Sequence, residues 1–255
     1  MLKKRLIGVV TIKNSWAVQS VGYRSYLPLG HPEYVVENLD RWGVDEIIVI
    51  CIDRSHRNLG PDLSILKRLS SLRLSTPLTF GGGIHTAKQA VSVIQLGAER
   101  ICIDAVLHDD PEKIFEMERL IGSQALVACL PFSIKSKVFF WYNYRTQKSI
   151  PFPKKIYDLF NKGLISEALI IDWRNEGSDN GFDINLIKKF PFKNISLIAF
   201  GGLNRINKLT AVLKCSSVVG AGVGNFLSYT EHAVQTLKTG LHQCQVRPSV
   251  YLGTV

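Results

Sequence analysis

Two pairs of corresponding segments recur in the two halves of the chain. The runs TPLTFGGGI (residues 76–84) and ISLIAFGGL (residues 195–203) carry glycines at their ends, and GAERICIDAV (residues 97–106) corresponds to CSSVVGAGVG (residues 215–224). A strand that ends in glycines leaves backbone N–H groups free to approach an anion. The repeat therefore predicts a fold of two duplicated halves, with a place for a phosphate in each.

Short apolar runs alternate with segments of helical period from end to end. The strand candidates are residues 5–11, 46–52, 78–80, 100–103, 126–130, 167–172, 196–200 and 218–221. The helix candidates are residues 32–42, 62–72, 86–96, 111–121, 156–162, 183–190, 206–213 and 229–237. This alternation predicts a single (β/α)8 TIM barrel over residues 1–255, built from two half-barrels, with its functional face at the carboxyl ends of the strands.

One connection is unusually long. Residues 133–152 (SIKSKVFFWYNYRTQKSIPF) are rich in aromatic residues and alternate in character. Such a pattern is typical of a β-ribbon rather than a bare loop, and we expect it to lie over the barrel mouth.

The composition suits one large core and limits the classes of function. Hydrophobic residues make up 46% of the 255 residues, and no Pro-, Gly- or Ser-rich stretch marks a linker. The formal charge is +10, but the Lys and Arg residues are scattered and no nucleic-acid-binding motif accompanies them. We expect no nucleic-acid partner, and a basic surface that suits a phosphorylated small molecule or an acidic protein.

The sequence also predicts a cytoplasmic protein. Lys13 interrupts the apolar stretch near the N-terminus, no small-residue cleavage site follows it, and no segment approaches the roughly 18 apolar residues of a membrane span. The cysteines show no CxxC spacing and predict reduced, buried thiols. The histidines lack the spacing of metal ligands, so neither a metal nor a cofactor is expected.

Several motifs occur in an order that resembles one known family. These motifs are KKRLIGVVTIK, GVDEIIVICID, PLTFGGGI, LGAERICIDA, IGSQALVAC, EALIIDWRNEGSDNGFD and LIAFGGL. Over nearly the whole chain they resemble the cyclase subunit of imidazole glycerol phosphate synthase, the HisF family. The resemblance implies a barrel that docks at its N-terminal face on a HisH-like glutaminase and receives ammonia through the barrel axis. The family uses that ammonia on a substrate with two phosphates, giving imidazole glycerol phosphate and an aminoimidazole carboxamide ribotide.

The resemblance implies an ammonia gate at the barrel bottom, made of Arg5, Glu46, Arg100 and Glu167. The family has Lys at the third of these places. Each residue opens a predicted strand, and alternating charges in a ring would neutralise one another; the alternative is that the four charges only cap strand ends. Side-chain alternation places an apolar set above the ring: Ile7, Val9, Thr11, Ile48, Ile50, Leu169 and Ile171.

The resemblance also implies a glutaminase interface. Glu99 stands where the family has an interface acid, and Gln124 closes the family's Gly-Ser-Gln before the fifth strand. Ordinary surface residues would give the same pattern.

The catalytic signature is where the chain departs from the family. Thr11 and Pro131 occupy the positions of the two family aspartates that act as general base and acid. A threonine hydroxyl is too weak an acid for this role, and proline has no titratable side chain. In the family's mobile first loop, a Lys that helps to hold the substrate is replaced by Gln19, and a preceding Gly by Ser15.

The two phosphate sites are retained unequally. The first keeps Gly83, but the family's Asn-Thr is Asp104-Ala105, which places an anion where a phosphate would sit. The second keeps glycines and an alanine that could still offer backbone donors, or that only form tight turns: Gly177, Gly202, Ala221 and Gly222.

Other residues are expected near the mouth. Three carboxylates could serve an altered chemistry or simply cap strand ends: Asp53, Asp172 and Glu176. Three tryptophans could close the mouth with apolar bulk: Trp16, Trp141 and Trp173.

Three hypotheses follow. In the first, the chain pairs with a HisH-like glutaminase and passes ammonia to a separate acceptor amidotransferase, as divergent HisF-like paralogues associated with amidation of bacterial surface sugars do. That acceptor should meet the mouth around Trp16, Trp141 and residues 133–152. In the second, it is a histidine-pathway cyclase with relocated acid–base groups. In the third, it is a non-enzymatic scaffold for the glutaminase. Whether the chain is itself an enzyme depends on which of these holds.

Overall fold

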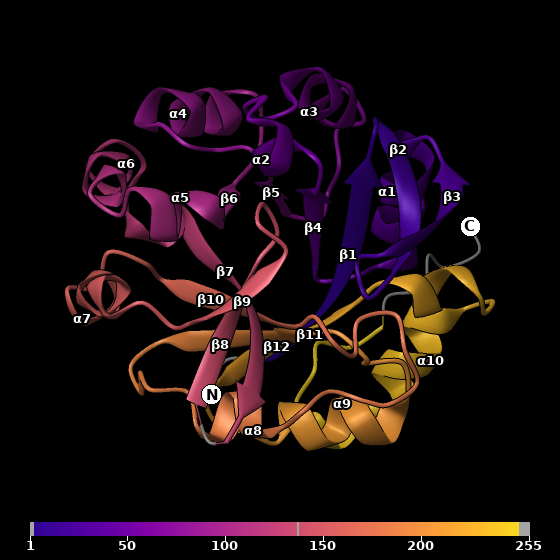
Figure 1. Ribbon diagram of the computed structural model, residues 1–255. Coiled ribbons are helices and arrows are strands. Elements are labelled where there is room, and N and C mark those ends of the chain that lie inside the picture. Colours follow the sequence, from indigo (N-terminus) through magenta and orange to yellow (C-terminus); the bar gives the residue numbers. More distant parts are fainter. Residues whose placement is uncertain (1–2, 137, 250–255) are drawn as a thin grey trace.

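Eight parallel strands form a closed barrel in the computed structural model, which describes residues 3–136 and 138–249 (Figure 1). β1 pairs with both β12 and β4, and β7 pairs with β10, so the ring of strands has no free edge. The barrel strands are β1 (Arg5–Lys13), β4 (Glu46–Cys51), β5 (Leu78–Gly81), β6 (Arg100–Ile103), β7 (Leu126–Lys135), β10 (Glu167–Asp172), β11 (Ser196–Phe200) and β12 (Val218–Val223). The predicted (β/α)8 barrel is confirmed.

Helices surround the ring of strands (Figure 1). They are α1 (Pro32–Trp42), α2 (Arg54–Arg57), α3 (Leu63–Ser70), α4 (Ala87–Gln95), α5 (Ala105–Asp109), α6 (Lys113–Ile121), α7 (Tyr157–Asn161), α8 (Asn185–Lys188), α9 (Ile206–Leu213) and α10 (Ala233–Gly240). The local sequence determines where several of these helices begin or end. Thr86 and Gln89 form a capping box at the start of α4, and Gly43 in the left-handed conformation ends α1. α10 begins later than predicted because His232 before it has φ 52°.

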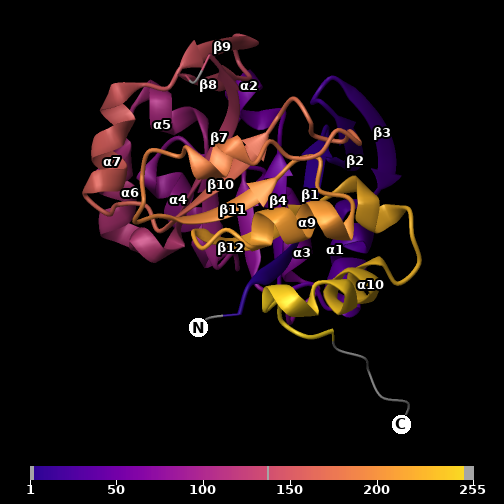
Figure 2. The same ribbon diagram turned by 90° about the horizontal axis from the view of Figure 1, so that it is seen from below.

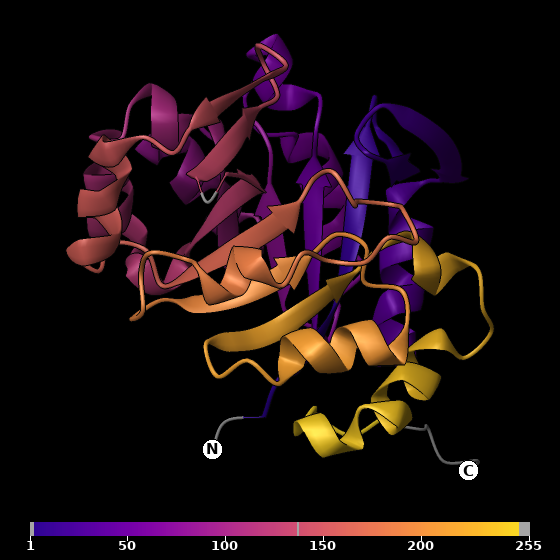
Figure 3. The same cartoon turned by 60° about the horizontal axis from the view of Figure 1, so that its bottom comes forward.

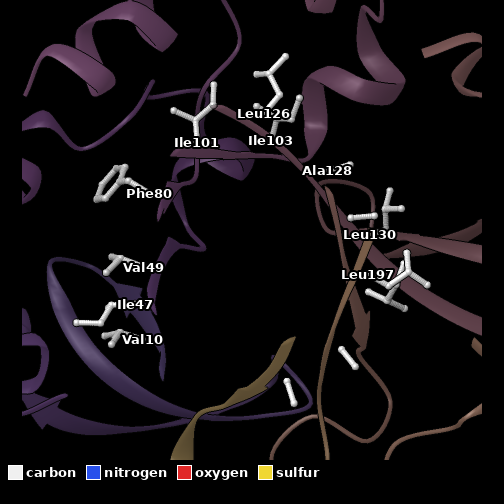
Figure 4. Packing of buried hydrophobic residues seen from close by; sticks show 14 of the residues in the cluster. Val10, Ile47, Val49, Phe80, Ile101, Ile103, Leu126, Ala128, Leu130 and Leu197 are labelled. Carbon is white, nitrogen blue, oxygen red and sulfur yellow. The ribbon is translucent and has the colours of Figure 1, made fainter. Parts of the chain in front are cut away.

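The strands have an outer and an inner face. In Figure 4 the labelled side chains, among them Val10, Val49 and Phe80, point away from the ring of strands, where the helices cover them. Alternate residues form a separate inner cluster, as predicted from the period of two. It contains Ile7, Val9, Ile48, Cys102, Val127, Cys129, Leu169, Ile171, Trp173, Ile198 and Phe200.

Two β-hairpins extend the barrel. β8 (Val138–Asn143) and β9 (Lys148–Pro151) pair with each other and with the end of β7, which confirms the predicted ribbon. The ribbon lies at the opposite end of the molecule from the start of β1 (Figure 2; Figure 3). The mouth is therefore the end that the ribbon covers.

The second hairpin was not expected. β2 (Trp16–Val21) and β3 (Ser25–Gly30) pair antiparallel, where the family resemblance implied a mobile loop. The four inner residues of β2 are all buried, so the segment shows no alternation that would signal a strand.

Candidate functional site

The four predicted gate residues form a closed ring of ion pairs where their strands begin. Arg5 lies 2.9 Å from Glu46 and 2.8 Å from Glu167. Arg100 lies 2.6 Å from Glu167 and also pairs with Glu46. Thr79 donates a further hydrogen bond to Glu46 at 2.7 Å. Each guanidinium thus bridges both carboxylates, and the structure brings together every residue of the predicted set.

The ring is largely buried, and the pKa values of two of its members reflect both this burial and the opposite charges beside them. Burial opposes the charge on Glu167, but Arg100 and Arg5 outweigh it and lower the pKa of this carboxyl. Burial likewise opposes the charge on Arg100, yet Glu46 and Glu167 raise its pKa. Glu167 and Arg100 therefore stay charged near neutral pH. With two guanidinium groups and two carboxylates, the ring is formally neutral.

Neither residue at the family's catalytic positions carries a titratable group. Thr11 is buried and pairs with Ile50 and with Val18 of the β2–β3 hairpin. Pro131 lies beside Ile171 in the sheet.

Three carboxyls at the mouth have a raised pKa, and one of them is Asp172, where burial outweighs the hydrogen bonds that it accepts. Burial raises the pKa of Asp104 to about 7, and burial also raises the pKa of Glu176 to about 7. Asp104 lines a central pocket of about 330 Å³. Two of the mouth carboxylates have structural partners: Asp172 accepts from Asn175 and Asp183, each at 2.8 Å, and Asp53 accepts from the Asn14 N–H at 3.1 Å.

Aromatic rings narrow the mouth above the inner cluster. The rings of Tyr142 and Trp173 stack with centroids 4.1 Å apart, and those of Tyr23 and Tyr144 lie 5.2 Å apart. Tyr23 lies in the turn of the β2–β3 hairpin, and Tyr142 and Tyr144 lie in β8 and the turn after it. The two hairpins thus bring residues that are distant in the sequence over one opening. The sequence predicted an aromatic ribbon over the mouth but not these ring contacts, because the partner rings lie far apart in the chain.

The predicted tryptophan contact surface needs a correction. Trp141 is fully buried at 0% exposure, packed against Phe132 and Phe152 under the ribbon, so it cannot meet a partner. Its inward position follows from the alternation of β8, which places this residue against the barrel. Trp16 is 47% exposed and is available for contact.

At the predicted first-half phosphate site, one backbone donor is already engaged within the chain. The N–H of Gly83 donates to the Ser55 hydroxyl at 3.1 Å. Gly83 and Asp104 line the same pocket, so an uncompensated acid shares the space that a phosphate would need. This half of the barrel is therefore poorly suited to an anion.

The second-half site keeps an open pocket of about 500 Å³. Gly177, Gly202 and Gly222 line it, together with Arg205. Ala221 is fully buried and is not among the lining residues, because its side chain belongs to the outer core. The pocket thus offers glycine backbone and one guanidinium to an anion, but Glu176 and Asp179 line it as well, and Arg205 lies 3.6 Å from Asp179.

The β2–β3 hairpin is fixed beside this second pocket. Glu176 accepts from the Ser20 hydroxyl at 2.9 Å and from the Tyr23 N–H at 3.2 Å. Asn225 donates to the Ser20 carbonyl at 2.6 Å, and Tyr229 donates to Gln19 at 2.9 Å. Gln19, at the place of a family substrate-binding Lys, is therefore engaged within the protein.

Glycine at position 177 is needed for this attachment. A Cβ there would lie 2.2 Å from the Ser20 carbonyl oxygen, at φ +70°, whereas Gly163 has φ +68° and nothing within 4 Å. We expect Gly177→Ala to lower the free energy of unfolding by about 3 kcal/mol, since it adds a clash to the cost of φ. Gly163→Ala, which meets only the cost of φ, should lose about 1 kcal/mol. Urea unfolding of both variants measures the difference, and equal losses would contradict the attachment.

The raised pKa of Glu176 predicts a pH dependence of stability. Because the group titrates near 7 when folded and near its ordinary value of 4.5 when unfolded, its contribution is fully present below about 4.5 and lost as pH rises through about 7. Between pH 4.5 and 7.5 we expect Glu176→Gln to lose about 3 kcal/mol less stability than the unchanged protein. Glu231→Gln, at an exposed site, should follow the unchanged protein. Chemical denaturation across this range is the test, and parallel curves for Glu176→Gln would refute it.

The two predicted interface residues lie at the end where the barrel strands begin. Glu99 is exposed and accepts from the Leu78 N–H at 2.6 Å, and Gln124 is exposed in the turn before β7. Their position on the surface of this end is compatible with the predicted interface role, which stays a prediction.

Other expectations concern sites of a different kind. Within residues 3–136 and 138–249, no group of three or more His, Cys, Asp or Glu could hold a metal ion. No helix in the described part of the chain is long and apolar enough to cross a membrane. The cysteines are free thiols, and all but Cys215 are buried.

Comparison with known proteins finds one family and many relatives. The family described as "Histidine biosynthesis protein" matches residues 5–233. A Vibrio vulnificus protein provisionally named imidazole glycerol phosphate synthase subunit hisF2 is 27% identical over 96% of this chain and 91% of its own length. Imidazole glycerol phosphate synthase subunit HisF of Pyrococcus furiosus is 28% identical over 93% of this chain and 95% of its own. A Campylobacter jejuni protein, provisionally named hisF2, is 29% identical over 92% and 95%.

Proposed function

This chain belongs to the histidine biosynthesis protein family as a HisF-like member, and from this premise we propose that it delivers ammonia without performing the cyclase reaction. It pairs with a HisH-like glutaminase at the end where the strands begin. Ammonia passes through the barrel to an acceptor amidotransferase at the mouth. Amidation of a nucleotide sugar for surface polysaccharide is the reaction that we assign to that acceptor.

One observation carries the proposal: the charged ring is complete while the catalytic carboxylates are replaced. Arg5 and Arg100 each bridge Glu46 and Glu167. Above the ring the inner cluster is apolar, which favours a small neutral molecule over an ion. If the chain were selected only for cyclisation, the Asp residues at positions 11 and 131 should have been kept together with the ring. The ring is intact and the Asp residues are absent, which favours a role in ammonia delivery.

The test couples the barrel to its glutaminase. Glutamine hydrolysis by the HisH-like subunit should be slow alone and rise when the barrel is added. Glu99→Lys and Gln124→Ala should weaken the complex, because they change the surface where the strands begin. Glu231→Gln, at an exposed site beside α10, is the control. A barrel that neither binds nor activates the glutaminase would overturn the proposal, and activation without nitrogen delivery would leave only a scaffold.

A second function, cyclisation by relocated acid–base groups, has one observation in its favour. Asp104 and Glu176 both titrate near neutral pH and flank the mouth, as general acids and bases do. The occupied Gly83 N–H speaks against it, because a substrate with two phosphates would lose one of its binding places.

A further inference from the structure

The central pocket contains a carboxyl that no cation compensates. Asp104 lines this space of about 330 Å³ at the end of β6. It sits at the N-cap position of α5, but its side chain does not cap that helix. Among the described residues no side chain forms an ion pair with it. Burial and then the charge of Asp109 raise its pKa, and the Trp141 indole N–H acts in the opposite direction. Withdrawing a carboxylate from water without a neighbouring cation costs free energy, so binding of a cationic ligand beside it would be favourable.

Two cations, Lys13 and Arg57, line the same pocket, and neither forms an ion pair with Asp104. The Lys13 ammonium lies 3.6 Å from the centroid of the Tyr26 ring. Arg57 lies 3.7 Å from Asp53 and is half exposed. These contacts leave Asp104 as the acid that a ligand entering the pocket can meet.

The walls of the pocket also suit a cation. Tyrosine side chains contribute much of the lining, and the faces of aromatic rings attract ammonium groups. The hydroxyl of Tyr144 is buried and has no hydrogen-bond partner within the described chain. The tyrosines that line the pocket are Tyr23, Tyr26, Tyr142 and Tyr144.

We propose that this pocket binds ammonium or a small primary ammonium ion, with its N–H groups donated to the Asp104 carboxylate and the Tyr144 hydroxyl oxygen. The inference rests on the proposed function and deepens it, since the pocket lies at the end of the barrel where ammonia would arrive. Neutral ammonia takes the proton of the Asp104 carboxyl: the O–H bond breaks, a new N–H bond forms, and an ammonium–carboxylate pair results. Return of the proton to Asp104 releases ammonia to the acceptor.

The experiment uses the full chain with ring-labelled tyrosine and follows the tyrosine NMR signals. Methylammonium chloride and ammonium chloride are titrated against potassium chloride at equal ionic strength. We expect saturable shifts of the Tyr144 and Tyr23 signals with both ammonium salts and none with potassium. Asp104→Asn restores the amide that the related family has there and should weaken binding about tenfold or more, since a charged hydrogen bond is lost. Glu231→Gln, which removes an exposed acid outside this pocket, should bind normally.

The outcomes separate the pocket from the pathway. Absence of saturable shifts, or equal binding by Asp104→Asn of intact fold, overturns the ammonium site and leaves the proposed function standing. Tyr144→Phe is a second variant for the same titration. It removes the hydroxyl oxygen that would accept from the ammonium ion and keeps the ring, so it should also weaken binding. In a second arm the barrel–glutaminase complex receives glutamine. The ammonium concentration that glutamine hydrolysis produces in bulk solution is measured, and the same concentration is added from outside as a comparison. Tyrosine shifts that appear with glutamine but not with the added ammonium support supply through the barrel. If no such shifts appear, the result counts against that supply and not against the pocket.

Discussion

Mixed with its glutaminase, glutamine and the histidine-pathway intermediate, the protein is expected to form imidazole glycerol phosphate at least about 10⁴-fold more slowly than HisF of Pyrococcus furiosus with its own glutaminase. Each positioned acid or base contributes about 10²–10⁴-fold to such a reaction. Thr11 and Pro131 offer neither group. A coupled assay of product formation, run in parallel with the archaeal subunit, measures the ratio.

The double variant Thr11→Asp/Pro131→Asp extends this prediction. It should stay within about tenfold of the unchanged protein, because substrate binding is damaged as well as proton transfer. Gly83 donates its N–H to Ser55, and Gln19 accepts from Tyr229. Rapid turnover by the unchanged protein would instead favour Asp104 and Glu176 as relocated catalytic groups.

Breaking the charged ring should have the largest effect on stability. Glu46 pairs with both Arg5 and Arg100 and is almost fully buried. Glu46→Gln leaves two guanidinium groups without that charge, so we expect the free energy of unfolding to fall by about 3–5 kcal/mol. Transfer of glutamine nitrogen to the acceptor should fall in the fraction that remains folded. Thermal unfolding and ¹⁵N transfer from labelled glutamine are the measurements.

Two matched variants interpret that result. Glu37→Gln removes the exposed pair with Arg41 and should change stability by no more than about 0.5 kcal/mol. Arg100→Lys restores the residue of the related family and keeps the charge, so transfer should survive although one bridging contact is lost. If folded Glu46→Gln delivers nitrogen normally, the ring has a structural role only.

The fold was predictable because its signals are local. Short apolar runs beginning at the charged residues Arg5, Glu46 and Glu167 marked the strands. The family resemblance indicated that these charges form a ring, and side-chain alternation then gave the inward face. The ribbon after β7 was also signalled, by its length and alternation. These features depend on the immediate neighbours of each residue in the chain.

What the sequence could not predict depends on distant contacts. β2 is buried on both faces by partners such as Glu176 and Asn225, more than 150 positions away, so its pattern resembled a loop. The engagement of the Gly83 N–H by Ser55 is of the same kind. Each requires knowing what lies opposite a residue across the barrel mouth.

The fixed β2–β3 hairpin has a consequence for the energetics of assembly. Where the family resemblance implied a mobile loop, this chain presents a strand pair held by Glu176, Asn225 and Tyr229. Ordering a backbone residue costs about 1–2 kcal/mol, and here folding has already met that cost. A protein that docks on the hairpin would therefore not have to offset this ordering cost. A small contact area would then suffice for binding, and the barrel would not need to rearrange.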